Sequence, residues 1–321
     1  MEVPFTKPGT WPDGIDPARM AAHIHRVLPV ACRVAILGLA DDLGVRLNHG
    51  RAGAAAGPTA FRAALARYGV AHPPGWTWPV VLDAGDIIPA HGHDEVALRE
   101  THDRVTAAVT ALLDLGLFPI GIGGGHDLTF PFVRAVAVRA RTAGKPLASG
   151  VYFDAHLDVR EHAGSGMAFR RLVEDCGVRT LHVHGHNPLV NSREHHEWFA
   201  AHGGKLRRPG IDPLAPREPM DMQALGTYQD QDDPFPPGPC FASLDLDVLD
   251  AAHAPGVSAI NPAGWAPQLA QAWMLALGRR ADVRCLDIME LNPALDHDGR
   301  TARIAAHLFL TFLRGLCERP A

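Results

Sequence analysis

Short apolar segments alternate with helix-like segments along most of this 321-residue chain, and this alternation restricts the possible folds more than any other feature of the sequence. Strands that alternate with helices are typical of a parallel sheet with helices on both faces. We therefore expect an α/β fold of three layers, in which helices flank a mostly parallel sheet. The predicted strands cover residues 34–39, 80–85, 118–123, 150–155, 180–185, 240–248 and 283–290.

The segment from Asp94 to Leu115 is the clearest predicted helix. Its apolar residues follow helical spacing, Asp94 suits the N-cap, and Gly116 suits the position just beyond the C-terminus. A core-like strand follows the segment 209–239, which is rich in proline, aspartate and glycine, so we interpret that segment as a surface excursion and not as a linker. We expect a single domain over residues 1–321, with residues 1–30 as an N-terminal extension.

The sequence FDAHLDVR at residues 153–160 follows an apolar run and contains three side chains that commonly bind metals. In an extended strand, Asp154, His156 and Asp158 would point to the same face. Two buried carboxylates without a compensating charge are costly, and a bound cation would offset that cost. The alternative is a strand end whose acidic groups are solvated.

Three other predicted strands end in residues of the same kind. The strand at 118–123 leads into GGGHD with His126, the strand at 240–248 carries Asp245 and Asp247 two residues apart, and the strand at 283–290 ends with Asp287 and Glu290. Ligands of open α/β sheets bind at the carboxyl ends of the strands. A glycine-rich turn could instead hold a phosphate, but no GxGxxG or Lys-Ser/Thr follows it. The four strand ends together therefore predict one metal site.

The residue types indicate which metal this site would take. The set contains imidazoles and carboxylates but no cysteine, which favours Mn²⁺, leaves Mg²⁺ and Fe²⁺ as alternatives and disfavours structural Zn²⁺. Six ligands with two bridging carboxylates suit a pair of ions about 3.5–4 Å apart, and such a pair activates water.

Composition and charge argue against several classes of partner. The net charge is −5, which does not indicate nucleic acid or an anionic membrane as a partner. No apolar run approaches the roughly 18 residues of a spanning helix, and the N-terminus does not resemble a signal peptide. The five cysteines are scattered without a CxxC pair, so we expect reduced thiols in a cytoplasmic protein.

Three of these motifs together resemble those of the ureohydrolases, the family of arginase, agmatinase and formimidoylglutamase. They are GGGH at 123–126, DAHLD at 154–158 and SLDLD at 243–247, and the resemblance runs from about residue 34 to residue 310. It implies an arginase-like α/β fold and two Mn²⁺ per chain. The implied ligands of one ion are His126, Asp154, Asp158 and Asp245, and those of the other are Asp154, His156, Asp245 and Asp247.

Further segments resemble the formimidoylglutamase subgroup. These are residues 41–65, SGMAFRRL at 165–172, APGVSA at 254–259 and residues 290–306. The implied reaction is hydrolysis of N-formimidoyl-L-glutamate to L-glutamate and formamide, a step of histidine degradation. Arginases and agmatinases carry a His-Gly pair after DAHxD, whereas this chain reads REHAGSGMAF, so we do not expect His162 to replace that histidine. Asp158 or Glu290 is the expected group for proton transfer.

The implied substrate, N-formimidoyl-L-glutamate, carries an amidinium cation and two carboxylates, and we expect these charges to determine its contacts. Glu290 would pair with the amidinium, while Arg160 and Arg170 are candidates to bind carboxylates. Ser165 is a further expected substrate contact. Arg160 could instead only balance the acidic cluster. The alternatives are an agmatinase, an arginase or another guanidino-acid hydrolase that releases urea, and, in a different class, a metal-binding regulator without activity. A deacetylase-like enzyme would need a different pair of histidines. A small-molecule amidine and a homo-oligomeric assembly are the partners that we expect.

Overall fold

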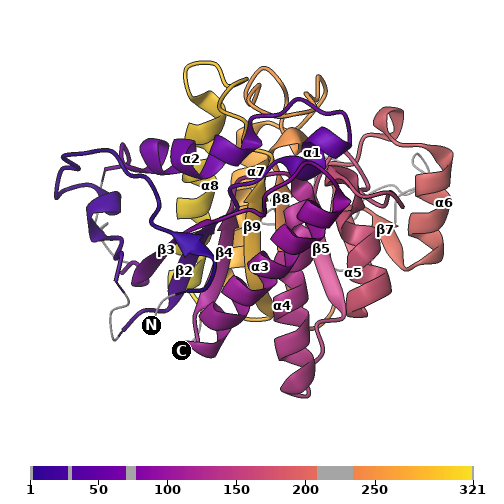
Figure 1. Cartoon of the computed structure of the whole chain (residues 1–321), viewed down its shortest axis with the longest axis horizontal. Coiled ribbons are helices and arrows are strands. Elements are labelled where there is room, and N and C mark those ends of the chain that lie inside the picture. The colour runs from indigo at the N-terminus through magenta and orange to yellow at the C-terminus, as the bar shows by residue number, and fades with distance from the viewer. Residues whose placement is uncertain (1–2, 28–30, 70–76, 208–233, 320–321) are drawn as a thin grey trace, which may run out of the picture.

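The computed structural model describes residues 3–27, 31–69, 77–207 and 234–319, and within them the chain forms one nine-stranded sheet (Figure 1). The strand order is β1-β3-β2-β4-β9-β8-β5-β6-β7, and only the pairing of β1 with β3 is antiparallel. The strands are β1 (Thr6–Lys7), β2 (Val34–Gly38), β3 (Val81–Ile87), β4 (Phe118–Ile122), β5 (Ser149–Phe153), β6 (Thr180–His184), β7 (Gly204–Leu206), β8 (Cys240–Asp245) and β9 (Val283–Met289).

All seven predicted strands are present, and the mostly parallel sheet is confirmed. The strand predicted at 240–248 ends earlier, because Leu246–Val248 forms a 3₁₀ turn. Strands β1 and β7 were not predicted. The segment 209–239, interpreted as a surface excursion, lies mostly outside the described residues.

Eight α-helices belong to the described residues, and the longest is the helix predicted from Asp94 onward. The Asp94 side chain accepts a hydrogen bond from the Ala97 N–H, and Gly116 has a φ of +72°, so both predicted ends are confirmed. The helices are α1 (Leu43–Leu47), α2 (Gly57–Leu65), α3 (Glu95–Asp114), α4 (Thr129–Thr142), α5 (Ala168–Cys176), α6 (Arg193–Ala201), α7 (Pro267–Arg279) and α8 (Arg300–Cys317).

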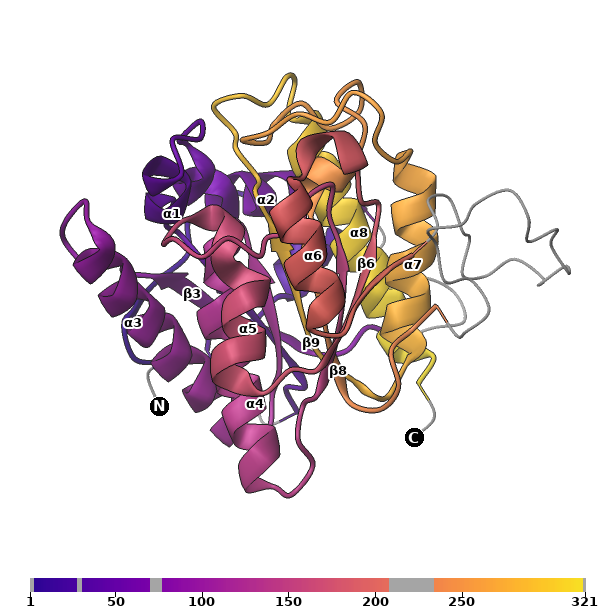
Figure 2. The same cartoon turned by 90° about the vertical axis from the view of Figure 1, so that its right-hand side faces the viewer.

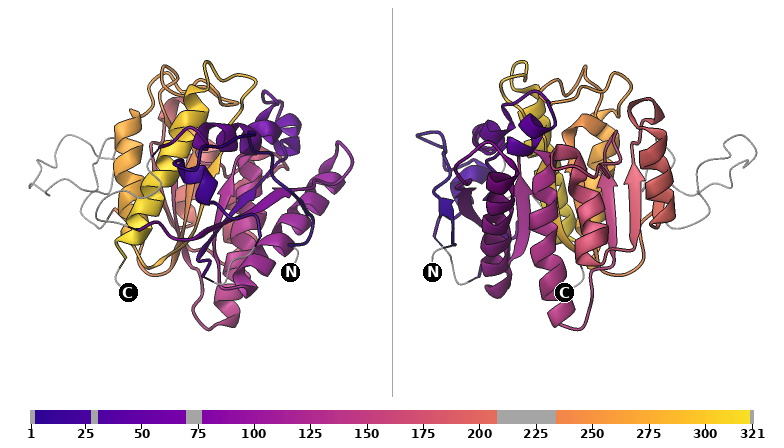
Figure 3. Two further views of the ribbon diagram at one scale, coloured as in Figure 1. Left: turned by 90° about the vertical axis from the view of Figure 1, so that its left-hand side faces the viewer. Right: turned by 45° about the vertical axis from the view of Figure 1, so that its right-hand side comes forward.

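The helices form two layers, one on each face of the sheet, as the sequence predicts. Figure 2 shows α3, α4 and α5 on one side of the strands and α7 and α8 on the other, and both views of Figure 3 show the same separation. Each face has its own hydrophobic core. One core contains Phe61, Trp273 and Phe309, and the other contains Val133 and Phe169. The sheet is thus buried on both faces and leaves its strand ends available for a site.

The segment before β2 packs onto the sheet edge. Strand β1 pairs with β3, and the Trp11 indole donates a 2.5 Å hydrogen bond to Asp83. The same carboxylate binds the buried guanidinium of Arg62, which also contacts Asp86 at 2.6 Å. This buried ion network joins the N-terminal segment, β3 and α2. Among the described residues, no helix has the length and apolarity needed to cross a membrane.

Candidate metal centre

The candidate site lies at the carboxyl ends of four neighbouring strands, β4, β9, β8 and β5. These strands are far apart in the chain, since β4 and β5 lie near its middle and β8 and β9 lie near its end. The strand order brings their ends together at one edge of the sheet, where ligands of such folds bind. The four polar strand ends recognised in the sequence therefore do meet at one place.

The residues after β5 do not continue the strand, so the prediction that their side chains share one extended face is wrong. Strand β5 ends at Phe153, and the chain then turns, with the His156 N–H donating a 2.6 Å hydrogen bond to Asp154 Oδ1. Asp158 adopts a left-handed backbone conformation with a φ of 48°. Its side chain nevertheless reaches the same place as Asp154, because the turn and not the strand alternation directs it there.

The end of β8 differs from the prediction in the same way. Asp245 is the last residue of the strand, and its Oδ1 accepts a 2.8 Å hydrogen bond from the Asp247 N–H at the start of the 3₁₀ turn. This bond folds the chain back, so that Asp247 also faces the site. Both carboxylates are buried.

Two groups of imidazole and carboxylate atoms result from these turns. His126 Nδ1 lies 3.2 Å from Asp154 Oδ2, 2.9 Å from Asp158 Oδ2 and 3.1 Å from Asp245 Oδ2. His156 Nδ1 lies 3.3 Å from Asp154 Oδ1 and 2.9 Å from Asp247 Oδ2. Asp154 contributes one oxygen to each group, which is the arrangement of a carboxylate between two cations.

Several features of these atoms fit a pair of divalent cations. His126 Nδ1 and Asp154 Oδ2 are buried but form no hydrogen bond of good geometry with any described residue, so both have a lone pair available. Burial, followed by the charges of Asp247 and Asp158, raises the pKa of Asp154 to about 6. Such crowding of acids is relieved by positive charge, and oxygen-rich sets with imidazole suit Mn²⁺.

A hydrogen-bonded chain behind His126 fixes the orientation of its ring. His126 Nε2 lies 3.0 Å from Ser243 Oγ, and the Ser243 hydroxyl donates a 2.5 Å hydrogen bond to Asp287 Oδ1. Because the hydroxyl gives its hydrogen to Asp287, Ser243 accepts from the Nε2–H of His126. The Nδ1 lone pair of His126 then faces the carboxylates. Ser243 and Asp287 are direct partners in the pairing of β8 with β9, so strand register sets this chain.

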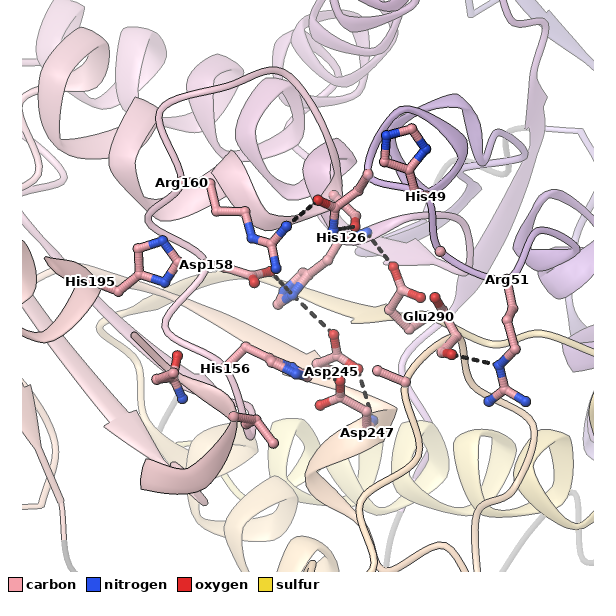
Figure 4. Close-up of a pocket in the computed structure, with 17 residues that line it drawn as sticks. His49, Arg51, His126, His156, Asp158, Arg160, His195, Asp245, Asp247 and Glu290 are labelled. Atoms are coloured by element: carbon pink, nitrogen blue, oxygen red, sulfur yellow. Dashed lines mark hydrogen bonds and ion pairs between the residues drawn. The ribbon is translucent and has the colours of Figure 1, made fainter. Parts of the chain in front are cut away.

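Glu290, just beyond β9, lies on the opposite side of the pocket from Asp158 (Figure 4). It also has a left-handed backbone, with a φ of 64°. Its Oε1 accepts a 2.9 Å hydrogen bond from the His126 N–H, whereas its buried Oε2 has no partner in the part of the chain that the structure describes. Burial raises the pKa of Glu290 to about 8. A cation placed at Oε2 would hold this carboxylate in its charged form.

The acidic groups open into a pocket with a volume of about 280 Å³, and Arg160 and Ser165 are among its lining residues. Sequence reasoning missed the contribution of α6: His195 was not among the predicted site residues, but it lines the pocket beside Arg160 (Figure 4). Asn191, which precedes that helix, also lines the pocket. The polar sequence around His195 resembles any exposed helix, so no local signal could have identified it.

Arg170 does not lie where the sequence analysis expected a substrate contact. Its Nε donates a 2.9 Å hydrogen bond to Glu174, and its guanidinium lies over the Trp198 ring. Neither Arg170 nor His162 is among the residues that line the pocket, and His162 is exposed. The structure thus brings Arg160, Ser165 and Glu290 to the candidate metal ligands, whereas Arg170 lies outside the pocket.

Comparison with known proteins agrees with this geometry. Residues 32–314 match the Arginase family. The chain is 37% identical over 302 residues to the formimidoylglutamase of Aromatoleum aromaticum, covering 89% of this chain and 84% of that protein. It is 34% identical over 299 residues to the formimidoylglutamase of Ralstonia nicotianae, covering 91% and 88%. A crystal structure of Trypanosoma cruzi formiminoglutamase with Mn²⁺ superposes with a TM-score of 0.77 at 28% identity, covering 94% and 99%.

Proposed function

The chain belongs to the arginase family, and from that membership we propose that it hydrolyses N-formimidoyl-L-glutamate with water to L-glutamate and formamide. It is a hydrolase that acts on C–N bonds of amidines, and it uses two Mn²⁺. The observation that carries the proposal is that the acidic cluster, Arg160 and Ser165 line the same pocket. An amidine with two carboxylates needs both kinds of group, since the acidic residues receive its amidinium cation and Arg160 and Ser165 receive a carboxylate.

The two groups of ligand atoms support an assignment for each ion. We assign His126, Asp154, Asp158 and Asp245 to one ion, and Asp154, His156 and Asp247 to the other. The resemblance to the ureohydrolases adds Asp245 to the second set. Asp154 and Asp245 would then be shared by the two ions. When bound, the manganese pair polarises water so that it can attack the amidine carbon.

The protein groups around the pocket would orient the substrate and move its protons. Glu290 Oε2, which has no hydrogen-bond partner among the described residues, is the proposed acceptor for the amidinium N–H groups. Water adds to the amidine carbon, the bond from that carbon to the glutamate nitrogen breaks, and this nitrogen takes up a proton as glutamate leaves. Asp158 faces the pocket next to the ligand atoms and is the proposed carrier of that proton. The remaining carbon and nitrogen leave as formamide.

A panel of substrates tests the proposal. The Mn²⁺-loaded protein is offered formimidoylglutamate, arginine, agmatine and guanidinobutyrate, and both formamide and urea are measured. We expect formamide from the first compound and little urea from the other three. Efficient urea release from a guanidino compound, without formamide from formimidoylglutamate, would identify another hydrolase of the family.

We also propose a compartment and an assembly state for the enzyme. A cytoplasmic location is supported by the five cysteines, which are all free and thus suit a reducing compartment. We also propose a homo-oligomer, which sedimentation of the purified enzyme would test directly.

A further inference from the structure

Asn48, the residue that follows α1, lies between the two pocket groups proposed to bind a substrate carboxylate. Its Oδ1 accepts a hydrogen bond from Arg160 Nη1, and its Nδ2 donates a 3.2 Å hydrogen bond to Ser165 Oγ. Asn48 itself lines the pocket. One carboxamide therefore holds a guanidinium and a hydroxyl side by side at the pocket wall.

The direction of these two hydrogen bonds determines what remains available to a ligand. Because Asn48 donates to Ser165 Oγ, the hydroxyl hydrogen of Ser165 is free to donate elsewhere. Because Asn48 is neutral, it holds Arg160 without cancelling its charge. Within the described residues, Arg160 forms no ion pair with a carboxylate, although acidic groups are nearby in the same pocket. A positive charge and a free hydroxyl donor thus remain for an anion.

The backbone around Arg160 restricts its side chain from the other end. The Arg160 N–H donates a 2.8 Å hydrogen bond to the Gly166 carbonyl, and a Cβ atom at Gly166 would lie 2.9 Å from Arg160 Cδ. Gly164, with a φ of +158°, lets the same loop approach Asn48, since a Cβ there would lie 3.2 Å from the Asn48 Cβ. The loop around these glycines is shaped to place Arg160 against Asn48.

We propose that Asn48 is a positioning residue for substrate specificity, which holds the Arg160 guanidinium without giving it a counter-ion and leaves the Ser165 hydroxyl free, so that together they bind a carboxylate of the substrate. This inference rests on the proposed function of the site. It does not require Asn48 to touch the reacting atoms. It makes the neutral carboxamide, and not only its shape, essential for selecting amidines that carry a carboxylate.

Asn48→Asp is the decisive variant, because it keeps the shape and reverses the chemistry. The carboxylate would still hold Arg160, but it would neutralise its charge and take the Ser165 hydrogen. Loss of a charge-assisted hydrogen bond of this kind predicts a KM for formimidoylglutamate about tenfold to a hundredfold higher, with kcat and metal content unchanged. Asn48→Ala, which leaves the charge and the hydroxyl intact, should raise KM less. N-butylformamidine, which lacks carboxylates, should be hydrolysed equally by the wild type and both variants.

Binding of L-glutamate, measured by calorimetry, gives a second readout that does not depend on turnover. We expect weaker binding in the Asp variant than in the Ala variant, and a smaller effect of Asn48→Asp when Ser165→Ala is already present. A wild-type KM and wild-type glutamate binding in the Asp variant, with impairment only in the Ala variant, would mean that Asn48 merely holds the loop. Equal losses on N-butylformamidine would also overturn the inference. If the wild type releases no formamide from formimidoylglutamate, the proposed function fails, while the calorimetry still tests the carboxylate receptor.

Discussion

Replacing Ser243 with alanine tests how the protein orients the imidazole of His126, a proposed manganese ligand. The change removes the only hydrogen bond found for His126 Nε2 among the described residues, at 3.0 Å, and it also removes the 2.5 Å donor to the buried carboxylate of Asp287. Loss of a partner that orients a metal-binding imidazole weakens metal affinity about 10–100-fold, which corresponds to roughly 1.4–2.8 kcal/mol. Separately, the loss of the Ser243 donor to the buried Asp287 carboxylate should lower the free energy of unfolding by about 1–3 kcal/mol.

Titration against chelators of graded affinity, with manganese counted per chain, measures the first effect. The loss should fall on the ion assigned to His126, so the content should decrease from two to one before the ion assigned to His156 is lost. Ser149→Ala is a matched control, because this buried serine of the adjacent strand β5 donates only to the Pro237 carbonyl. Unchanged affinity for both ions in Ser243→Ala would refute the role given to the Ser243–Asp287 chain.

Three other predictions have defined outcomes. Asp245→Ala should release both ions in a metal analysis, whereas Asp247→Ala should release one, because, of these two residues, Asp245 is assigned to both ions and Asp247 to one. Equal retention of manganese in the two variants would contradict this assignment. Arg160→Ala should raise the KM for formimidoylglutamate about tenfold to a hundredfold at constant metal content. Arg160→Lys should restore the KM only in part, since an ammonium cannot form two parallel hydrogen bonds. A change in metal binding at constant KM would show that Arg160 only balances charge. Arg62→Ala should lower the free energy of unfolding in urea by about 3–5 kcal/mol, because it leaves buried carboxylates unpaired; a loss below about 1 kcal/mol would show that water reaches them.

The sequence predicted the strands and the position of the site better than the local geometry of the site. Apolar runs of five to seven residues were sufficient for the strands that form the centre of the sheet. Strands β1 and β7, with two and three residues, are too short to show any periodicity. The alternation rule failed after Phe153, because the chain turns there, and the His156 N–H donates to the Asp154 side chain instead of to a neighbouring strand.

The sequence also contained a signal about Arg170 that was not used. Arg170 and Glu174 are four residues apart on α5, a spacing at which opposite charges pair on a helix surface. That spacing favours a helix pair over a substrate contact. The role of His195 could not have been predicted in this way, because only the packing of α6 beside the strand ends brings it to the pocket.

The left-handed backbone at Asp158 and Glu290 bears on any attempt to engineer a more heat-resistant form. A side chain other than glycine costs roughly 1–2 kcal/mol in this conformation, and glycine avoids that cost. A library screened for thermal tolerance alone would therefore enrich glycine at both positions. Each glycine variant selected in this way would lack a carboxylate that faces the pocket. Libraries for stabilising this enzyme should hold these two codons fixed and seek their gains on the outer helices, far from the strand ends.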